Sequence, residues 1–149
     1  MFTIEFISSE PELQDEGDDP WYALWGRVTL GDYWELFLAS LSLWTRADYE
    51  RQWREAATRL VAGETRSAFC TSALQFWWVM WRDGSEIRVH EELLTPERLA
   101  SVGAVHDTRR APYELIRPYA SVTDDGHPIS EWRLSVTDIE NFLRRLPGH

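Results

Sequence analysis

The chain of 149 residues contains no lysine, and its 15 basic residues, all of them arginine, are outnumbered by 25 acids. The resulting net charge of −10 disfavours nonspecific binding to nucleic acid, because phosphate contacts need Lys or Arg. We attribute the missing lysine itself to the codon bias of a GC-rich genome, so it indicates no mechanism.

Cysteine is nearly absent too, since Cys70 is the only one. An intrachain disulfide is therefore excluded, and a reducing cytoplasm is the expected compartment. Cys70 lies in the apolar stretch Ala68-Phe69-Cys70, which predicts a small buried hydrophobic residue rather than a nucleophile. The first residues lack the basic start and apolar run of a signal peptide, and no stretch approaches the roughly twenty apolar residues that span a bilayer. We expect a soluble cytoplasmic protein.

Motifs for chemistry are also missing. The histidines are His90, His106, His127 and His149, and none has an HxH, HExxH or comparable metal-ligand spacing. The sequence has no GxSxG and no glycine-rich phosphate loop. His106-Asp107 is best interpreted as a solvated turn, and the acid pairs Glu91-Glu92 and Asp124-Asp125 are chain neighbours rather than a pair across a cleft. We therefore predict a protein that is not an enzyme and uses no cofactor or metal.

What the chain does have is a local concentration of acids. The first 35 residues carry nine acids against Arg27 alone, a charge of 1 − 9 = −8, and the remaining 114 carry 14 − 16 = −2. Six acids fall between Glu10 and Asp19, and large aromatic residues follow directly. A dense negative charge beside rigid aromatic anchors favours a basic protein partner. The predicted partner-binding residues are Asp15, Glu16, Asp18, Asp19, Trp21 and Trp25; the alternative is a disordered, solubilising loop.

The apolar share of 44%, with nine tryptophans, indicates a globular chain, and its length favours one domain over residues 1–149. Period-two patterns predict strands over 2–7, 21–30 and 33–41, with a loop over 8–20 and a hairpin turn at Gly31-Asp32. Further strands are expected over 65–73, 76–81 and 86–93, with a turn at Asp83-Gly84. Of Trp77, Trp78 and Trp81, at least two should be in the core.

The most secure element is a mid-chain helix. Thr45 and Asp48 form a capping-box pair, and Gly63 marks its end. The apolar stripe that we expect to be buried comprises Tyr49, Trp53, Ala56, Ala57, Leu60 and Val61. Near the C-terminus, Ser135 or Thr137 begins a second helix with Ile139, Phe142, Leu143 and Leu146 on its apolar face. Between them, residues 96–100 suggest a helical turn, and 113–119 and 129–134 suggest strands. The predicted fold class is α+β, with about seven or eight mostly antiparallel strands in curved sheets.

Four motifs, in order, resemble one family of immunity proteins from bacterial contact-dependent growth inhibition systems (CdiI). They are the W-x-x-x-D-Y-x-x-x-W start of the helix at Trp44–Trp53, the T-x-S-A strand at Thr65–Ala68, the apolar strand with its acidic hairpin, and I-S-E-W at Ile129–Trp132. The resemblance spans residues 43–94 and 126–146, and the first forty residues share little of it.

The resemblance implies a Whirly-like fold and a small cytoplasmic protein that binds and inactivates the toxic C-terminal domain of a cognate effector. A member of the family neutralises a nuclease that acts on ribosomal RNA, so a basic nuclease domain is the expected partner. The alternative is a Whirly-like protein that binds single-stranded nucleic acid through exposed aromatic side chains. The sequence leaves monomer and dimer open, because unpaired edge strands would permit either.

Overall fold

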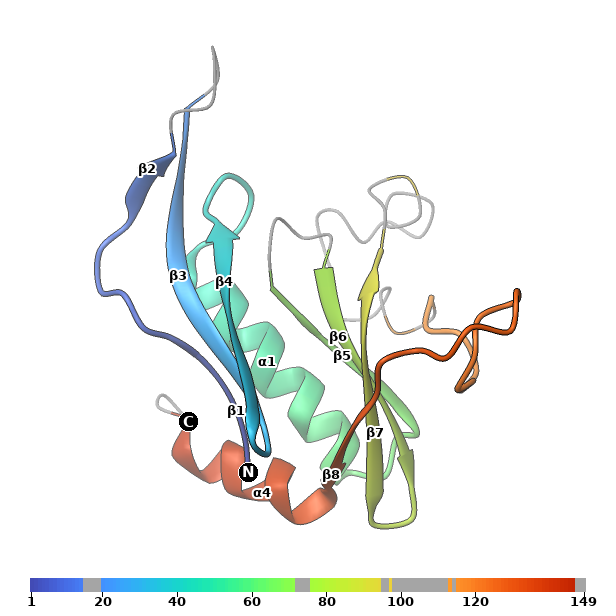
Figure 1. Cartoon of the computed structure of the whole chain (residues 1–149). Coiled ribbons are helices and arrows are strands. Elements are labelled where there is room, and N and C mark those ends of the chain that lie inside the picture. The colour runs from blue at the N-terminus through green and yellow to red at the C-terminus, as the bar shows by residue number, and fades with distance from the viewer. Residues whose placement is uncertain (15–19, 72–75, 95–96, 98–112, 114, 147–149) are drawn as a thin grey trace.

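The computed structural model describes residues 1–14, 20–71, 76–94, 97, 113 and 115–146. Over these residues the chain forms two open four-stranded sheets, in which every pair of strands is antiparallel, and the helices α1 and α4 (Figure 1). The predicted α+β class, with about seven or eight mostly antiparallel strands, is thereby confirmed: the structure has eight strands, all in antiparallel pairs. Neither described helix combines the length and the apolar character needed to cross a membrane.

The N-terminal sheet is built around the long strand β3 (Trp21–Leu30). One edge of β3 pairs with β4 (Tyr33–Ser40), after a tight turn in which Gly31 takes a φ of 65°. Its other edge is shared: β1 (Phe2–Phe6) pairs with the second half of β3, and β2 (Glu12–Gln14) with the first half. The amides of Ile7 and Ser8 both donate to the carbonyl of Trp25, where the chain bulges between β1 and β2.

The expected loop over 8–20 is therefore partly wrong, because it contains β2. The reason is the length of β3: its ten residues outreach the five of β1 and leave backbone groups that a further segment can satisfy. The short segment around Leu13 shows too little alternation to predict this pairing.

The C-terminal sheet runs in the order β5 (Arg66–Cys70), β6 (Phe76–Asp83), β7 (Glu86–Leu93) and β8 (Trp132–Ser135). Gly84, with a φ of 62°, lies in the turn between β6 and β7. The turn consists of Gly84 and Ser85, one position later than the predicted Asp83-Gly84, because Asp83 still pairs with Glu86. All three tryptophans of β6 are buried, as the continuous apolar run indicated.

Two expectations for the later chain were wrong. The last strand begins at Trp132 rather than Ile129, and the described residues of 113–119 form no strand. That segment instead lies against the sheet through side chains: the indole of Trp81 donates to the carbonyl of Arg117 at 2.9 Å, and Arg66 donates to the carbonyl of Ile116 at 2.8 Å. Apart from Glu97, the predicted turn over 96–100 lies outside the described residues.

Helix α1 (Arg46–Val61) begins with the predicted capping box between Thr45 and Asp48. At its end Ala62 is the C-cap, and Gly63 follows with a φ of 106°. The amides of Gly63 and Glu64 donate to the carbonyls of Leu60 and Arg59, which is the hydrogen-bond pattern of a Schellman motif. The predicted stripe is buried except for Val61, which lies at the edge of the stripe and is exposed.

Helix α1 also completes the free edge of β5. The side-chain amide of Gln52 donates to the carbonyl of Ala68 at 2.7 Å and accepts from the amide of Cys70 at 2.9 Å. The indole of Trp53 donates to the carbonyl of Cys70 at 2.7 Å. These side chains satisfy backbone groups that a neighbouring strand would otherwise pair.

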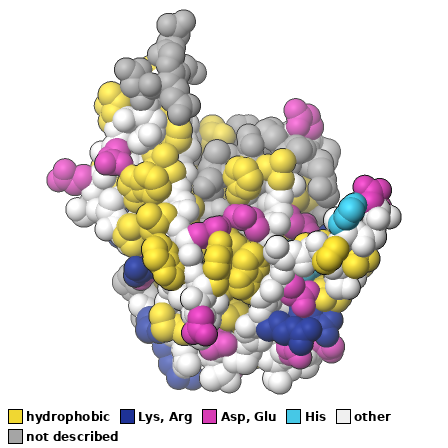
Figure 2. Space-filling model, in the orientation of Figure 1, with side chains coloured by type: hydrophobic (Ala, Val, Ile, Leu, Met, Phe, Trp, Pro, Cys, Tyr) yellow, Lys and Arg dark blue, Asp and Glu magenta, His cyan; other side chains and the backbone are white. Residues whose placement is uncertain are grey.

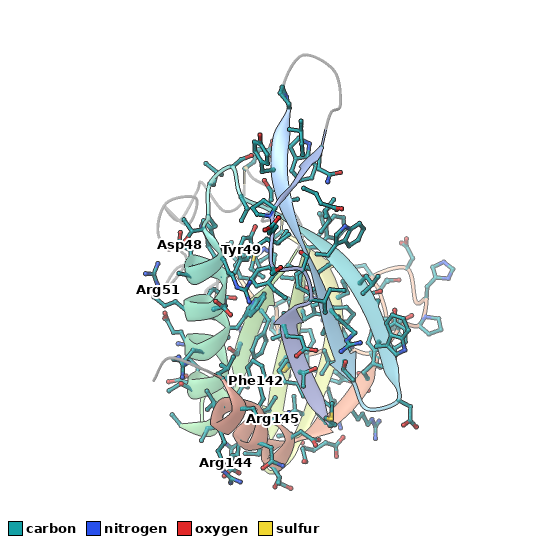
Figure 3. All side chains as sticks on the ribbon, turned by 90° about the vertical axis from the view of Figure 1, so that its left-hand side faces the viewer. Asp48, Tyr49, Arg51, Phe142, Arg144 and Arg145 are labelled. Atoms are coloured by element: carbon teal, nitrogen blue, oxygen red, sulfur yellow. The ribbon has the colours of Figure 1, made fainter. Side chains whose placement is uncertain are left out.

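Helix α4 (Val136–Arg145) has Ser135 as its N-cap, and Ser135 forms a capping box with Asp138. Its Phe142 packs in the core against Phe2 of β1 and next to Phe69 of β5, with ring centroids 4.9 and 6.3 Å away. The core thus lies between the inner faces of the two sheets and the helices. The outer face of the N-terminal sheet is turned away from it, and neither helix covers that face (Figure 3).

Candidate partner-binding surface

Strands β2 and β3 position the part of the predicted site that the structure describes. Asp15, Glu16, Asp18 and Asp19 lie outside the described residues, between the end of β2 and the start of β3. Trp21 pairs with Gln14 at the base of this connection, and both Trp21 and Trp25 are half-buried on the outer face of the sheet. The indole of Trp25 donates a hydrogen bond of 2.6 Å to Oε2 of Glu12. The structure thus places both predicted aromatic anchors on one face, beside an acid of the predicted cluster.

The same face carries apolar side chains that the predicted site did not include. Because side chains alternate along a strand, Trp34, Leu36 and Leu38 of β4 share this face with Trp21 and Trp25. Trp34 is 58% exposed and Leu36 is 47% exposed. Figure 2 shows hydrophobic side chains in a column along β3 and β4, with acidic side chains beside it. The alternation in residues 34–38 predicts that Trp34, Leu36 and Leu38 share one face of the strand, but it does not predict which face points outward.

A pair of carboxylates lies where β4 approaches β7. The hydroxyl of Tyr33 donates to Glu35 at 2.6 Å, and this bond first, with burial and the Glu35 charge, raises the pKa of Tyr33 to about 12. Glu91 of β7 keeps part of its surface exposed. Partial burial of its carboxyl group, together with the charge of Glu35 and a hydrogen bond to it, raises the pKa of Glu91 to about 7. Near neutral pH, the carboxyl group of Glu91 is therefore protonated part of the time.

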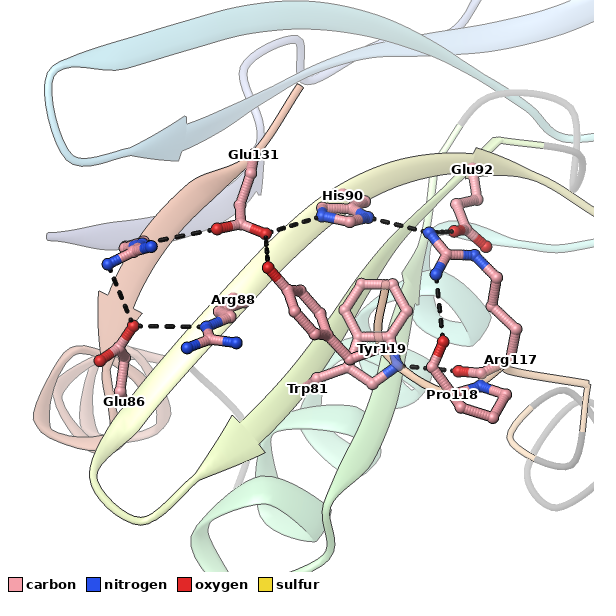
Figure 4. Close-up of polar contacts among 10 residues, drawn as sticks. Trp81, Glu86, Arg88, His90, Glu92, Arg117, Pro118, Tyr119 and Glu131 are labelled. Atoms are coloured by element: carbon pink, nitrogen blue, oxygen red, sulfur yellow. Dashed lines mark hydrogen bonds and ion pairs between the residues drawn. The ribbon is translucent and has the colours of Figure 1, made fainter. Parts of the chain in front are cut away.

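The outer face of the C-terminal sheet carries a closed polar cluster (Figure 4). His90 is fully buried, and its Nε2 and Nδ1 atoms lie 3.0 Å from Glu131 Oε1 and 3.0 Å from Arg117 Nη2. Because arginine only donates, Nδ1 accepts from Arg117, and Nε2 is the atom that donates to Glu131. Tyr119 donates to Glu131 at 2.5 Å, and Glu92 pairs with Arg117 at 2.7 Å.

Glu131 is the centre of that cluster. Its burial acts to raise its pKa, but the hydrogen bonds from Tyr119, His90 and Arg133 outweigh burial, and the net pKa lies below its usual value. Both ring nitrogens of His90 are engaged and the ring is fully buried, so it has no access to a substrate. This cluster therefore attaches residues 115–131, the segment before β8, to the sheet.

The other chemistry-bearing groups give no site of their own. Cys70 is buried within β5, in agreement with its expected role in packing. Over the described ranges, no three His, Cys, Asp or Glu side chains group so that they could hold a metal ion. The geometry is that of an α+β protein with an exposed, partly aromatic surface suited to a macromolecular partner.

Comparison with known proteins identifies the family. Residues 39–142, well over half of the chain, match the model of the CdiI N-terminal domain. The chain therefore belongs to the CdiI family of immunity proteins, as the sequence motifs indicated.

Among solved structures, the fold is similar to a chain of the CdiA-CT/CdiI toxin and immunity complex from Enterobacter cloacae, with a TM-score of 0.80, 22% sequence identity and coverage of 98% of both chains. At that identity the likeness shows the fold alone. A comparison with the curated proteins finds no match.

Proposed function

We propose that this chain is an immunity protein that binds the C-terminal toxin domain of its cognate effector and blocks its activity in the cytoplasm. Membership of the CdiI family carries the proposal, and the toxin-immunity complex with the same fold supports it. The toxin domain that we propose is a basic nuclease. Nucleases hold phosphates with cationic surfaces, and the first 35 residues of this chain supply the opposite charge.

The proposed contact residues are Asp15, Glu16, Asp18 and Asp19 for charge, with Trp21 and Trp25 as anchors. The acids would accelerate the encounter with a basic partner, and the two indoles, which share the outer face, would hold it. An inhibitor of this kind works by covering a surface, so no catalytic group is needed.

The experiment uses the toxin domain encoded immediately upstream of this chain, in an active-site variant for binding and in its active form for growth rescue. We expect tight binding by titration calorimetry that weakens at high salt, and rescue of cells that express the active toxin. Absence of both binding and rescue would overturn the proposal. Salt-sensitive binding of single-stranded oligonucleotides in place of the toxin would favour the nucleic-acid alternative.

A further inference from the structure

The outer face of the N-terminal sheet presents a continuous row of large apolar side chains. The outer row is defined as Trp21 and Trp25 of β3 with Trp34, Leu36 and Leu38 of β4. Trp25 lies opposite Leu38, Arg27 opposite Leu36, and Thr29 opposite Trp34 in the β3–β4 register. The row therefore runs along both strands, on the side away from the core.

This row is unusual because much of the inner side of the same strands is already apolar and buried. Phe37 and Ala39 alternate with the outer row along β4 and face the core. An antiparallel sheet that buries one face commonly presents polar residues on the other. Here Trp34 and Leu36 remain 58% and 47% exposed, which is the signature of a contact surface rather than of a solvated face.

The other sheet shows the contrast. On the outer face of the C-terminal sheet, Trp81 is covered by the segment before β8. The indole of Trp81 donates a hydrogen bond to the carbonyl of Arg117, and the ring centroids of Trp81 and Tyr119 are 5.7 Å apart. Over the N-terminal sheet, no described helix lies on the outer row, and Figure 3 shows that face open. Among the described residues, one outer face is thus covered by a segment of the chain itself, and the other carries no such segment.

The charge around the outer row indicates the chemistry of that partner. Over residues 1–14 and 20–35 the described chain has five acids and one arginine, and Arg27 is paired with Glu5 at 2.9 Å. Glu10 and Asp32 are exposed, and Glu12 is held against Trp25. An apolar centre with an acidic surround matches a partner whose apolar contact residues are flanked by Lys or Arg.

We infer that the outer row is the centre of the toxin interface, with Trp34 and Leu36 as its main anchors and the exposed acids Glu10, Glu12 and Asp32 as its charged margin. This rests on the proposed function and adds two residues that neither the family match nor the acidic cluster identifies. Binding energy in such interfaces concentrates in central aromatic and aliphatic side chains, and marginal charges act mainly on the rate of encounter.

The test is the double variant Trp34→Ser with Leu36→Ser, measured by surface plasmon resonance against the upstream toxin domain. We expect the dissociation constant to rise at least about 100-fold, mainly through faster dissociation and with an unchanged salt dependence of association. Leu43→Ser with Val122→Ser is the matched control, because Leu43 and Val122 are also exposed, at 62% and 48%, but lie off the sheet face. We expect the control to change affinity by less than about 3-fold.

Both variants change exposed side chains, so circular dichroism and thermal melting should match the wild type and exclude unfolding as a cause. Wild-type affinity in the double variant would overturn the inference and leave the proposed function standing. No binding by the wild type would overturn both. A wild-type dimer that the double variant converts to a monomer, with toxin affinity unchanged, would assign the row to self-association and also overturn the inference.

Discussion

The indole nitrogen of Trp25 donates a 2.6 Å hydrogen bond to Oε2 of Glu12, and this bond joins β3 to the short strand β2 by side chains as well as by backbone. β2 has only three residues, so few backbone hydrogen bonds hold it. The bond also fixes the direction of one carboxylate on the proposed interface.

A double-mutant cycle with Trp25→Phe and Glu12→Ala measures this link. Each single change should lower the free energy of unfolding by about 0.5–1 kcal/mol, because an exposed hydrogen bond contributes roughly that much. The two effects should not add, which gives a coupling energy of about 0.5–1 kcal/mol by urea denaturation. Additive effects would show that the contact does not stabilise β2.

Neutralising the four acids between Asp15 and Asp19 should change the rate at which the toxin domain associates. With Asp15→Asn, Glu16→Gln, Asp18→Asn and Asp19→Asn together, we expect association at low salt to slow about 10-fold and its salt dependence to flatten, with dissociation nearly unchanged. Stopped-flow mixing with the toxin domain measures both rates.

The chain offers a matched control for this test. The double variant Asp18→Asn/Asp19→Asn removes two adjacent negative charges. Its control is the double variant Asp124→Asn/Asp125→Asn, which removes two adjacent negative charges from exposed positions in a different part of the chain. Only the first pair should slow association. Equal effects would mean that net charge, rather than this segment, steers the encounter.

Much of the fold could be predicted where local signals agree with the tertiary structure. Thr45 and Asp48 fixed the start of α1, and Gly31 and Gly84 marked two hairpins, because caps and turns depend on the residues that form them. The burial of Trp53 followed from its place on the helical stripe.

The rest depends on neighbours that a local pattern does not contain. Alternation along β4 separates Trp34 and Leu36 from Phe37, but both sets are apolar, so only packing against α1 and the other sheet decides which set is buried. His90 alternates with Val89 and lies on the outer side of β7. Its full burial comes from the irregular segment around Tyr119, whose position no periodicity predicts.

Gln52 should be among the polar residues whose loss destabilises the fold most. Gln52→Leu leaves the carbonyl of Ala68 and the amide of Cys70 without this partner at a buried strand edge, so we expect a loss of about 2–4 kcal/mol in the free energy of unfolding. Arg51→Gln, one position away and exposed, is the control and should cost less than about 0.5 kcal/mol. Similar urea midpoints for both variants would contradict the role of Gln52 at the edge of β5.

Glu91 should make stability depend on pH near neutrality. Its folded-state pKa of about 7 lies above the ordinary value of 4.5, so the folded state binds the proton more tightly than the unfolded state. The contribution of Glu91 to the free energy of unfolding is fully present below pH 4.5 and is lost as the pH rises through about 7. Between pH 4.5 and 8, the urea midpoint of the wild type should therefore fall by an amount that is absent in Glu91→Gln. In Glu35→Gln this fall should be smaller. Parallel profiles for the wild type and Glu91→Gln would rule out a raised pKa.

Glu131 should act in the opposite direction. Hydrogen bonds from Tyr119, His90 and Arg133 hold the pKa of Glu131 below its usual value. Its contribution to the free energy of unfolding is therefore present at a pH above the pKa in the unfolded state, and it is lost as the pH falls through the pKa in the folded state. Glu131→Gln should remove this acid-side loss. Because Gln lacks the charge that strengthens these bonds, the variant should also cost about 2–3 kcal/mol at pH 7.

Glu86→Gln is the matched control for Glu131, because Glu86 lies on the same face with two arginine partners but is 44% exposed, and its ion pairs are 3.5 Å long. Exposed ion pairs contribute little, so this variant should lose less than about 1 kcal/mol and keep the acid-side loss. If the two variants instead lose equal stability, the segment before β8 is held by its apolar contacts and backbone. Tyr119→Phe separates these cases, since it keeps the ring against Trp81 and removes only the 2.5 Å bond to Glu131.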